Sequence, residues 1–266
     1  MDFKCVSLDI TGSVATVRLN QPEVLNALSA EMINGLNEAL DAIEAATPAI
    51  RCLVLTGAGR SFCSGANLQS VGRGERTAGS RLDAGRLLET AYHPLLRRFR
   101  NFSAPIVTAV NGPAAGAGMS LALLGDLVLC ARSAYFLQAF RRIGLVPDCG
   151  STWLLPRLIG RARALELSLL GEKLQAETAL AWGLVARVYN DDALMPEALR
   201  LARDLAEGPS VALGLIRRLY WESAENSFED QLDLECRMQR IAGASSDFEE
   251  GATAFLEKRP AKFTGK

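Results

Sequence analysis

A loop made only of small residues, placed between a strand and a helix, is the feature that most constrains this fold. Ile106-Val-Thr-Ala-Val110 is a β-branched apolar run, which is typical of a buried strand. Asn111-Gly-Pro113 breaks the run, and only alanine and glycine follow as far as Gly118. Such a loop can present only its backbone, and where it opens a helix its N–H groups are free donors. The segment predicts either a cradle for a negatively charged oxygen or a tightly packed turn.

Length and charge limit the class of protein. The 266 residues can bury a large core, and 29 basic residues nearly balance 30 acidic ones, for a net charge of −1. This balance gives no electrostatic basis for binding nucleic acid. No apolar run is long enough to cross a membrane, and the first residues lack the pattern of a signal peptide. We therefore expect a cytoplasmic protein that binds neither nucleic acid nor membrane.

The cysteines and the single histidine argue against a metal site. The six cysteines are scattered, form no CxxC pair and lie mostly inside apolar runs, which indicates reduced thiols. His93 is the only histidine. We expect no resident metal.

A short glycine motif was the one candidate for a nucleotide cofactor. Gly57-Ala-Gly59 follows a predicted strand at 51–56, as in the dinucleotide-binding fingerprint. The third glycine of that fingerprint falls on Phe62, and no acidic residue ends a second strand about 20 residues later. The sequence therefore disfavours a nicotinamide or flavin site.

Strands and helices alternate in residues 1–150, whereas the remainder is predicted to be mainly helical. A β-hairpin is predicted from the alternating runs 5–10 and 14–19. Ser29 is a good N-cap for a helix with one apolar face, formed by Met32, Ile33, Leu36, Leu40 and Ile43. Other strands are predicted at 126–131, 135–137 and 184–189, and other helices at 81–101, 153–159, 160–171, 176–182, 192–207, 210–223, 228–242 and 248–257.

A second loop of small residues follows the strand at 51–56. Phe62-Cys-Ser-Gly-Ala-Asn-Leu68 encloses small residues between apolar ones. If the strands before the two loops are neighbours, the loops lie side by side at one edge of the sheet. Two N–H donors that converge on one point form an oxyanion hole. The sequence offers both loops and leaves open whether they converge.

Several motifs in register along essentially the whole chain resemble the crotonase (enoyl-CoA hydratase/isomerase) superfamily. They are Asn26-Ala-Leu28, Phe62–Leu68, Ala109–Gly118, Asp126, Ala181-Trp-Gly-Leu-Val185 and Phe255-Leu-Glu-Lys-Arg-Pro-Ala-Lys-Phe263. The resemblance implies an α/β fold: a spiral of ββα units over residues 1–195 and a C-terminal helical region, 196–266, for oligomerisation. It also implies a homotrimer or hexamer.

The same resemblance implies an acyl-CoA thioester substrate, with CoA carried as part of the substrate and no separate cofactor. The thioester oxygen would be held by the N–H groups of Ala66 and Ala117. Asn67 stands where the family commonly has aspartate. The other implied substrate contacts are Ala27, Ser64, Gly65, Asn67, Leu68, Gly116, Phe140, Phe263 and Lys266. The last two resemble terminal residues that contact the CoA of a neighbouring subunit.

Departures from the hydratase pattern indicate an isomerase. Hydratases of the family use two glutamates, whose positions fall on Ser120 and Phe140. Asp148, in Leu145-Val-Pro-Asp-Cys-Gly150, matches the single acid/base carboxylate of members that shift a double bond. Apolar neighbours are expected to raise its pKa by desolvation. The alternative for Asp148 is a helix N-cap before Trp153.

Three further segments resemble a branch of the family that opens a ring 1,2-epoxide of phenylacetyl-CoA to an oxepin. They are Tyr92–Arg98, Gly144–Pro156 and Phe263–Lys266. We therefore expect an isomerase of such epoxides or of 3-enoyl-CoA, in which Asp148 moves a proton while the oxyanion hole holds a thioester enolate.

Three other functions stay open. The chain could be an enoyl-CoA hydratase, a thioester hydrolase with Ser120 as nucleophile and His93 as base, or a non-catalytic acyl-CoA binder. The sequence around Ser120 is not GxSxG, and His93 fits a packed or surface position better than a base. In the polar segment 69–80 and just after it, Arg73, Arg76 and Arg81 fit either CoA phosphates or a solvated loop face.

Overall fold

The computed structural model describes residues 1–67 and 83–266. Leu68, predicted as a substrate contact, and Arg73, Arg76 and Arg81, considered for the CoA phosphates, lie outside the described residues.

The N-terminal segment is an antiparallel meander of β1 (Asp2–Phe3), β2 (Val6–Thr11) and β3 (Val14–Leu19), which confirms the predicted hairpin. Helix α1 (Ala30–Glu44) begins as expected, because the Ser29 side chain accepts a hydrogen bond of 3.1 Å from the Met32 N–H. All five residues of its predicted apolar face are buried. This face packs the helix against β2 and β3.

A seven-stranded sheet forms the centre of the molecule, in the order β1-β2-β3-β4-β5-β7-β10. The strands after the meander are β4 (Cys52–Gly57), β5 (Ile106–Val110), β7 (Leu127–Ala131) and β10 (Arg187–Tyr189). From β3 onward every pairing is parallel. Every residue of β4 and β5 is buried, as expected of strands covered on both faces. Because β4 and β5 are parallel neighbours, the loops that follow them meet at one edge of the sheet.

The predicted helix at 81–101 is interrupted. Its described part consists of α3 (Ala84–Leu87), a π-helical turn at Leu88–Tyr92 and α4 (His93–Asn101). Pro94, at the start of α4, has no N–H to continue the α-helical ladder, and the π turn directly precedes it. The register change was not predicted from the apolar spacing.

Small elements surround the loop after β5. Strands β6 (Ala114–Ala115), β8 (Tyr135–Leu137) and β9 (Lys173–Gln175) form a second sheet, and neither β6 nor β9 was predicted. The other elements here are helix α5 (Ala117–Ala122), 3-10 turns at Pro22–Val24 and Phe140–Ile143, and helices α6 (Ser151–Ile159), α7 (Arg161–Leu170) and α8 (Ala176–Trp182).

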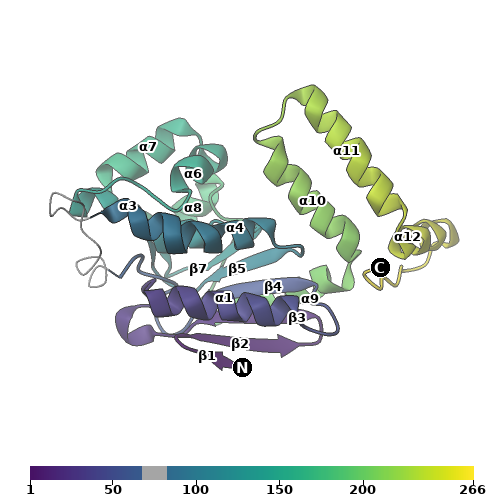
Figure 1. Cartoon of the computed structure of the whole chain (residues 1–266), viewed down its shortest axis with the longest axis horizontal. Helices are drawn as coiled ribbons and strands as arrows, with labels where there is room; N and C mark the ends of the chain where they lie inside the picture. The colour runs from purple at the N-terminus through teal and green to yellow at the C-terminus, as the bar shows by residue number, and fades with distance from the viewer. Residues whose placement is uncertain (68–82) are drawn as a thin grey trace.

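The last four helices divide between the core and the periphery. Helix α9 (Leu194–Glu207), which contains the start of the predicted helical region 196–266, packs against β4, β5 and β7. Helices α10 (Ser210–Ser223) and α11 (Phe228–Gly243) form a hairpin beside the core, followed by α12 (Ser246–Glu257) near the C-terminus (Figure 1). The peripheral helices expose large apolar side chains, among them Ile216, Tyr220, Phe228, Phe255 and Leu256.

An ion pair between a buried arginine and a partly exposed aspartate joins this periphery to the sheet. The Arg217 guanidinium on α10 lies 2.7 Å from the Asp126 carboxylate, which also accepts a 2.8 Å hydrogen bond from the Ile106 N–H. No helix in the described ranges is long and apolar enough to span a membrane.

Candidate active site

A cavity of about 550 Å³ opens where the loops after β4 and β5 meet. Seven of the predicted site residues line it, drawn from four separate segments of the chain: Ser64, Gly65, Ala66, Gly116, Ala117, Phe140 and Asp148. The structure therefore brings the two backbone loops and the predicted acid/base carboxylate to one place.

The two loops are joined directly along their length. The Pro113 carbonyl accepts hydrogen bonds of 3.1 Å from the N–H groups of Phe62 and Cys63, and the Ala115 N–H donates 2.9 Å to the Cys63 carbonyl. Gly118 is required at this contact, because a Cβ there would lie 2.4 Å from the Cys63 carbonyl oxygen. These contacts answer the question that the sequence left open, since the loops do converge.

Each loop has one backbone donor with no acceptor among the described residues. Around Ala66, the Gly65 carbonyl and the Asn67 N–H both bond to Leu28, at 2.8 and 3.2 Å. Ala117 is the first residue of α5, so its N–H has no acceptor within the helix. In the part of the chain that the structure describes, no acceptor is found for either the Ala66 or the Ala117 N–H. Two free donors on one cavity wall suit an oxygen that gains negative charge.

Two carboxylates lie on the described wall of the cavity, Asp83 and Asp148. Asp83 accepts from the N–H groups of Gly85 and Arg86 as the N-cap of α3, which leaves Asp148 as the candidate acid/base. The Asp148 Oδ1 is buried and has no hydrogen-bond partner among the described residues. Burial raises the pKa of this carboxyl group above its ordinary value, while the Cys149 thiol and the charge of His93 act in the opposite direction. A desolvated carboxylate with one oxygen left unpaired is a good proton acceptor.

The alternative reading of Asp148 as a helix N-cap is wrong. Helix α6 begins after Gly150, and no side chain caps it. The backbone carbonyl of Asp148, rather than its carboxylate, accepts from the Ser151 N–H at 3.0 Å.

Apolar side chains form much of the remaining wall. Phe140 is only 7% exposed, and its ring lies 3.7 Å from the position that a Cβ on Gly116 would take. Leu87, Leu88, Ile143 and Leu145 also line the cavity. Such walls exclude water from the carboxylate and suit an apolar acyl group.

The residues of the hydrolase alternative are not assembled. The Ser120 side chain is fully buried, does not line the cavity, and its hydroxyl lies within hydrogen-bond distance of main-chain carbonyls. His93 lines a different cavity of about 340 Å³, together with Cys149 and Trp153. No group of residues that could hold a metal ion is found within 1–67 and 83–266.

Four predicted contacts lie away from the cavity of their own chain. Asn67 lies in the loop after β4 and Ala27 directly precedes Leu28, which bonds to that loop, but neither residue lines the cavity. Phe263 packs against Gly251 of α12, and Lys266 lies beside α12 as well, since its carbonyl accepts from the Asp247 N–H at 3.0 Å.

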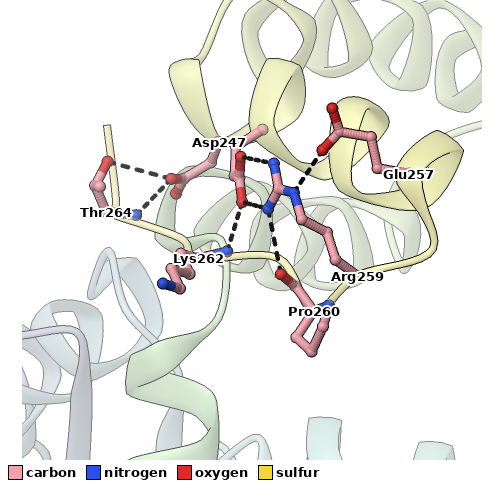
Figure 2. A network of polar contacts seen from close by, with 7 residues as sticks. Asp247, Glu257, Arg259, Pro260, Lys262 and Thr264 are labelled. Carbon is pink, nitrogen blue, oxygen red and sulfur yellow. Dashed lines mark hydrogen bonds and ion pairs between the residues drawn. The ribbon is translucent and has the colours of Figure 1, made fainter.

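Acidic side chains of α12, of which Asp247 is buried, bond to this C-terminal segment. The Asp247 carboxylate, on α12, accepts from the N–H groups of Thr264 at 2.6 Å and Gly265 at 2.8 Å. Arg259 forms ion pairs of 2.7 Å with Glu250 and Glu257 (Figure 2). The position of Phe263 and Lys266 is therefore fixed by the fold.

The cavity also contains residues that sequence reasoning did not assign to a site. Arg86 and Arg142 are the basic residues on its described wall, and Tyr92 lies there with its hydroxyl donating 2.8 Å to the Leu28 carbonyl. Tyr92 falls in the predicted helix at 81–101 and in the segment Tyr92–Arg98 that carries the family resemblance, but no site role was predicted for it. The sequence contains one signal for these wall residues: Arg142 lies two residues after the predicted contact Phe140, and the structure places both in the same 3-10 turn.

Comparison with known proteins assigns the chain to a family. The model of a family described as "Enoyl-CoA hydratase/isomerase" matches residues 9–266. The chain belongs to this family. It is 49% identical over 253 residues to the 1,2-epoxyphenylacetyl-CoA isomerase of Escherichia coli, covering 95% of each chain. It is 43% identical over 266 residues to a Rhodobacter capsulatus protein named "Probable enoyl-CoA hydratase", covering 100% of both.

Solved structures of the enoyl-CoA hydratase/isomerase family confirm the predicted crotonase fold. The crystal structure of an enoyl-CoA hydratase/isomerase from Cupriavidus metallidurans superposes with a TM-score of 0.91 at 31% identity. The match covers 100% of this chain and 98% of the other.

Proposed function

We propose that this member of the family is an acyl-CoA isomerase in which Asp148 is the single acid/base. One observation carries the proposal: a single cavity is lined by Asp148 and by Ala66 and Ala117, whose N–H groups have no acceptor among the described residues. The acyl-CoA substrate supplies CoA as part of itself, and the chemistry needs no separate cofactor.

The proton transfer changes neither the composition nor the overall oxidation state of the substrate. The Asp148 carboxylate takes a proton from the carbon next to the thioester carbonyl, and the electron pair of that C–H bond moves into an enolate. The Ala66 and Ala117 N–H groups stabilise the charge on the thioester oxygen, each contributing about 3–4 kcal/mol to the transition state. The same carboxyl group returns the proton two carbons further along, which moves a double bond from the 3-position to the 2-position.

We propose a ring 1,2-epoxide of phenylacetyl-CoA as a second substrate class. The Escherichia coli relative named for that activity supports it, as do the apolar walls around Phe140. Opening of such an epoxide to an oxepin is also an isomerisation without net gain or loss of atoms.

The direct test is the turnover of Asp148→Asn with a 3-enoyl-CoA. We expect kcat to fall by about 10²–10⁴, the usual contribution of a positioned acid/base, while KM changes little. Ser151→Ala is the matched control, because that buried hydroxyl next to the same segment has no partner among the described residues. Unchanged turnover in Asp148→Asn would overturn the assignment.

Hydratase activity is the second candidate, favoured by the name of the Rhodobacter capsulatus relative. Ser120 and Phe140 occupy the two positions expected to carry glutamate, so water addition would depend on Asp148 alone. Production of a 3-hydroxyacyl-CoA faster than isomerisation would favour this reading.

We propose that the protein assembles as a homotrimer or hexamer through α10 to α12. The exposed side chains of Tyr220 (79%), Phe255 (83%) and Leu256 (80%) support this, since isolated chains seldom expose so much apolar surface. In that assembly Phe263 and Lys266 would contact the CoA of a neighbouring subunit. Light scattering after gel filtration measures the state, and a monomeric mass would contradict the proposal.

We also propose that the enzyme acts in the cytoplasm. Four of its cysteines, Cys52, Cys63, Cys130 and Cys149, are buried as unpaired thiols, which suits a reducing compartment.

A further inference from the structure

Ser120 makes a contact that the proposed chemistry does not use. It lies on α5, three residues after the oxyanion donor Ala117, and its side chain is completely buried. The Ser120 hydroxyl lies 3.1 Å from the Asp148 carbonyl oxygen and 3.4 Å from the Gly116 carbonyl oxygen. A serine hydroxyl has one proton to donate, and Gly116 already accepts from the Ser120 N–H. The shorter contact therefore joins α5 to the segment that carries the proposed base.

The segment around Asp148 depends on such contacts for its shape. Gly144, Cys149 and Gly150 all have positive φ, at 71°, 52° and 83°. Cys149 is not a glycine, so this conformation is unfavourable by itself and has to be imposed by neighbours. Val146, on the same segment, is 77% exposed and contributes little packing. The Asp148 carbonyl, in contrast, accepts from both the Ser120 hydroxyl and the Ser151 N–H.

We infer that Ser120 is a positioning residue, whose hydroxyl holds the main chain of Asp148 at a fixed place relative to the oxyanion donor Ala117. This inference rests on the proposed function of Asp148. Through Ser120, one short helix sets the positions of both the group that stabilises the enolate and the group that moves the proton.

The reaction needs the oxyanion donors and the Asp148 carboxylate at fixed relative positions, because both act on the same thioester. The thioester oxygen is fixed by Ala66 and Ala117, so the carbon next to the carbonyl has one location, and the Asp148 carboxylate must reach it. A displacement of about 1 Å in such a constellation costs on the order of 10²-fold in rate. Loosening the Asp148 segment should therefore lower kcat more than it raises KM.

Ser120→Ala against Ser151→Ala is the test, measured in the full-length protein with a 3-enoyl-CoA. Each substitution deletes one buried serine oxygen, but only Ser120 bonds to Asp148 through its side chain. Alanine is the best helix former, so we expect α5 to form in Ser120→Ala and α6 to form in Ser151→Ala. Hydrogen exchange of residues 145–151 reports the order of the segment independently of activity, and the remaining amides report the fold.

We expect Ser120→Ala to exchange faster at 145–151 and to lose about 10–100-fold in kcat, with KM changed far less. Its acid limb in the pH profile should move to lower pH, because water then reaches the carboxyl group. The titratable and charged groups around Asp148 stay unchanged in both variants; they are Cys149, Tyr92, His93, Asp83, Arg86 and Arg142.

The outcomes separate this inference from the proposed function. If Asp148→Asn is inactive while Ser120→Ala matches Ser151→Ala in exchange, kcat and pH profile, Ser120 has no positioning role and only this inference fails. If Asp148→Asn retains full turnover, the proposed function fails, and the inference fails with it.

Discussion

Gly65 and Ala115 approach so closely that a Cβ on Gly65 would lie 2.8 Å from the Ala115 carbonyl oxygen. The same Cβ would lie 3.6 Å from the Ala117 nitrogen, and Gly65 has a φ of 98° that other residues rarely adopt. The two donor loops therefore touch through a glycine.

Gly65→Ala should move Ala66 away from Ala117 and lower kcat/KM by about 10²–10³, as the loss of one oxyanion donor does. Gly12→Ala is the control: its φ is 61°, but a Cβ there would meet nothing within 4 Å. It should lose about 1 kcal/mol of stability and keep its activity. Equal kinetics for the two variants would show that the loop contact does not matter.

Phe140→Leu should weaken the binding of aromatic acyl groups. The ring packs over Gly116 and is nearly buried, so a smaller side chain leaves space on the acyl wall. A loss of about 1–2 kcal/mol of apolar contact raises KM by about 5–30-fold. A short aliphatic thioester serves as the control substrate, and an equal rise in KM for both would contradict a role in ring recognition.

The pH dependence follows from the raised pKa of Asp148. The carboxyl group must be ionised to accept a proton, so kcat/KM should fall as pH falls through that pKa. Burial is the largest cause of the raised pKa of Asp148. The fall in kcat/KM should therefore begin at a pH above the ordinary pKa of aspartate, which is about 3.9. A limb at or below that value would contradict the desolvated site.

His93→Gln tests a second contribution to the pH profile of kcat/KM. His93 lowers the pKa of Asp148 when charged, so its removal should move the acid limb upward and leave the maximal rate nearly unchanged. The hydrolase alternative predicts a different result, because it needs His93 as the base for Ser120. Loss of activity in His93→Gln, with an acyl-enzyme visible by mass spectrometry in the unsubstituted protein, would favour the hydrolase.

Arg217→Met should be strongly destabilising. Its side chain is 4% exposed and donates to Asp126 at 2.7 Å and to the carbonyls of Phe99 and Phe102 at 2.6 and 2.8 Å. Removing the guanidinium leaves the Phe99 and Phe102 carbonyls without their donor, and each buried acceptor left unpaired costs about 1–3 kcal/mol. Arg218→Met is the matched control, since its pair with Glu222 is exposed and should contribute less than about 1 kcal/mol. Denaturant unfolding of both variants measures the difference.

Local sequence patterns predicted most of the secondary structure correctly. The Ser29 cap, the apolar face of α1 and the bounds of α10 depend on spacing within one element, and all are found as expected. The short strands β6 and β9 were missed because Ala-Ala and Lys-Leu-Gln contain no β-branched or aromatic residue, whereas the equally short β8, Tyr135–Leu137, was predicted from its aromatic run. The π turn before Pro94 was missed because its apolar positions still fit a continuous helix.

The backbone donors of the site were predictable from local composition, whereas Asp148 and Phe140 were assigned only through the family resemblance. Small residues around Ala66 and Ala117 indicated two donor loops, and the parallel pairing of β4 with β5 brings the loops together. The wall residues Arg86, Arg142 and Tyr92 come from separate helices and turns, and no local pattern reports which of their faces meets a distant loop. The role of Ser120 was likewise not visible, because its partner Asp148 is distant in sequence.

Deuterium incorporation at the carbon next to the thioester carbonyl, and at the carbon two positions beyond that one, tests the central claim most directly. A 3-enoyl-CoA is incubated with the enzyme in deuterated water, and the label is located by mass spectrometry and NMR. We predict incorporation by the unsubstituted enzyme and by Ser151→Ala, and a rate lower by about 10²–10⁴ in Asp148→Asn. Incorporation by Asp148→Asn at the unsubstituted rate would contradict the account, as would an enzyme that binds the thioester and neither labels nor isomerises it.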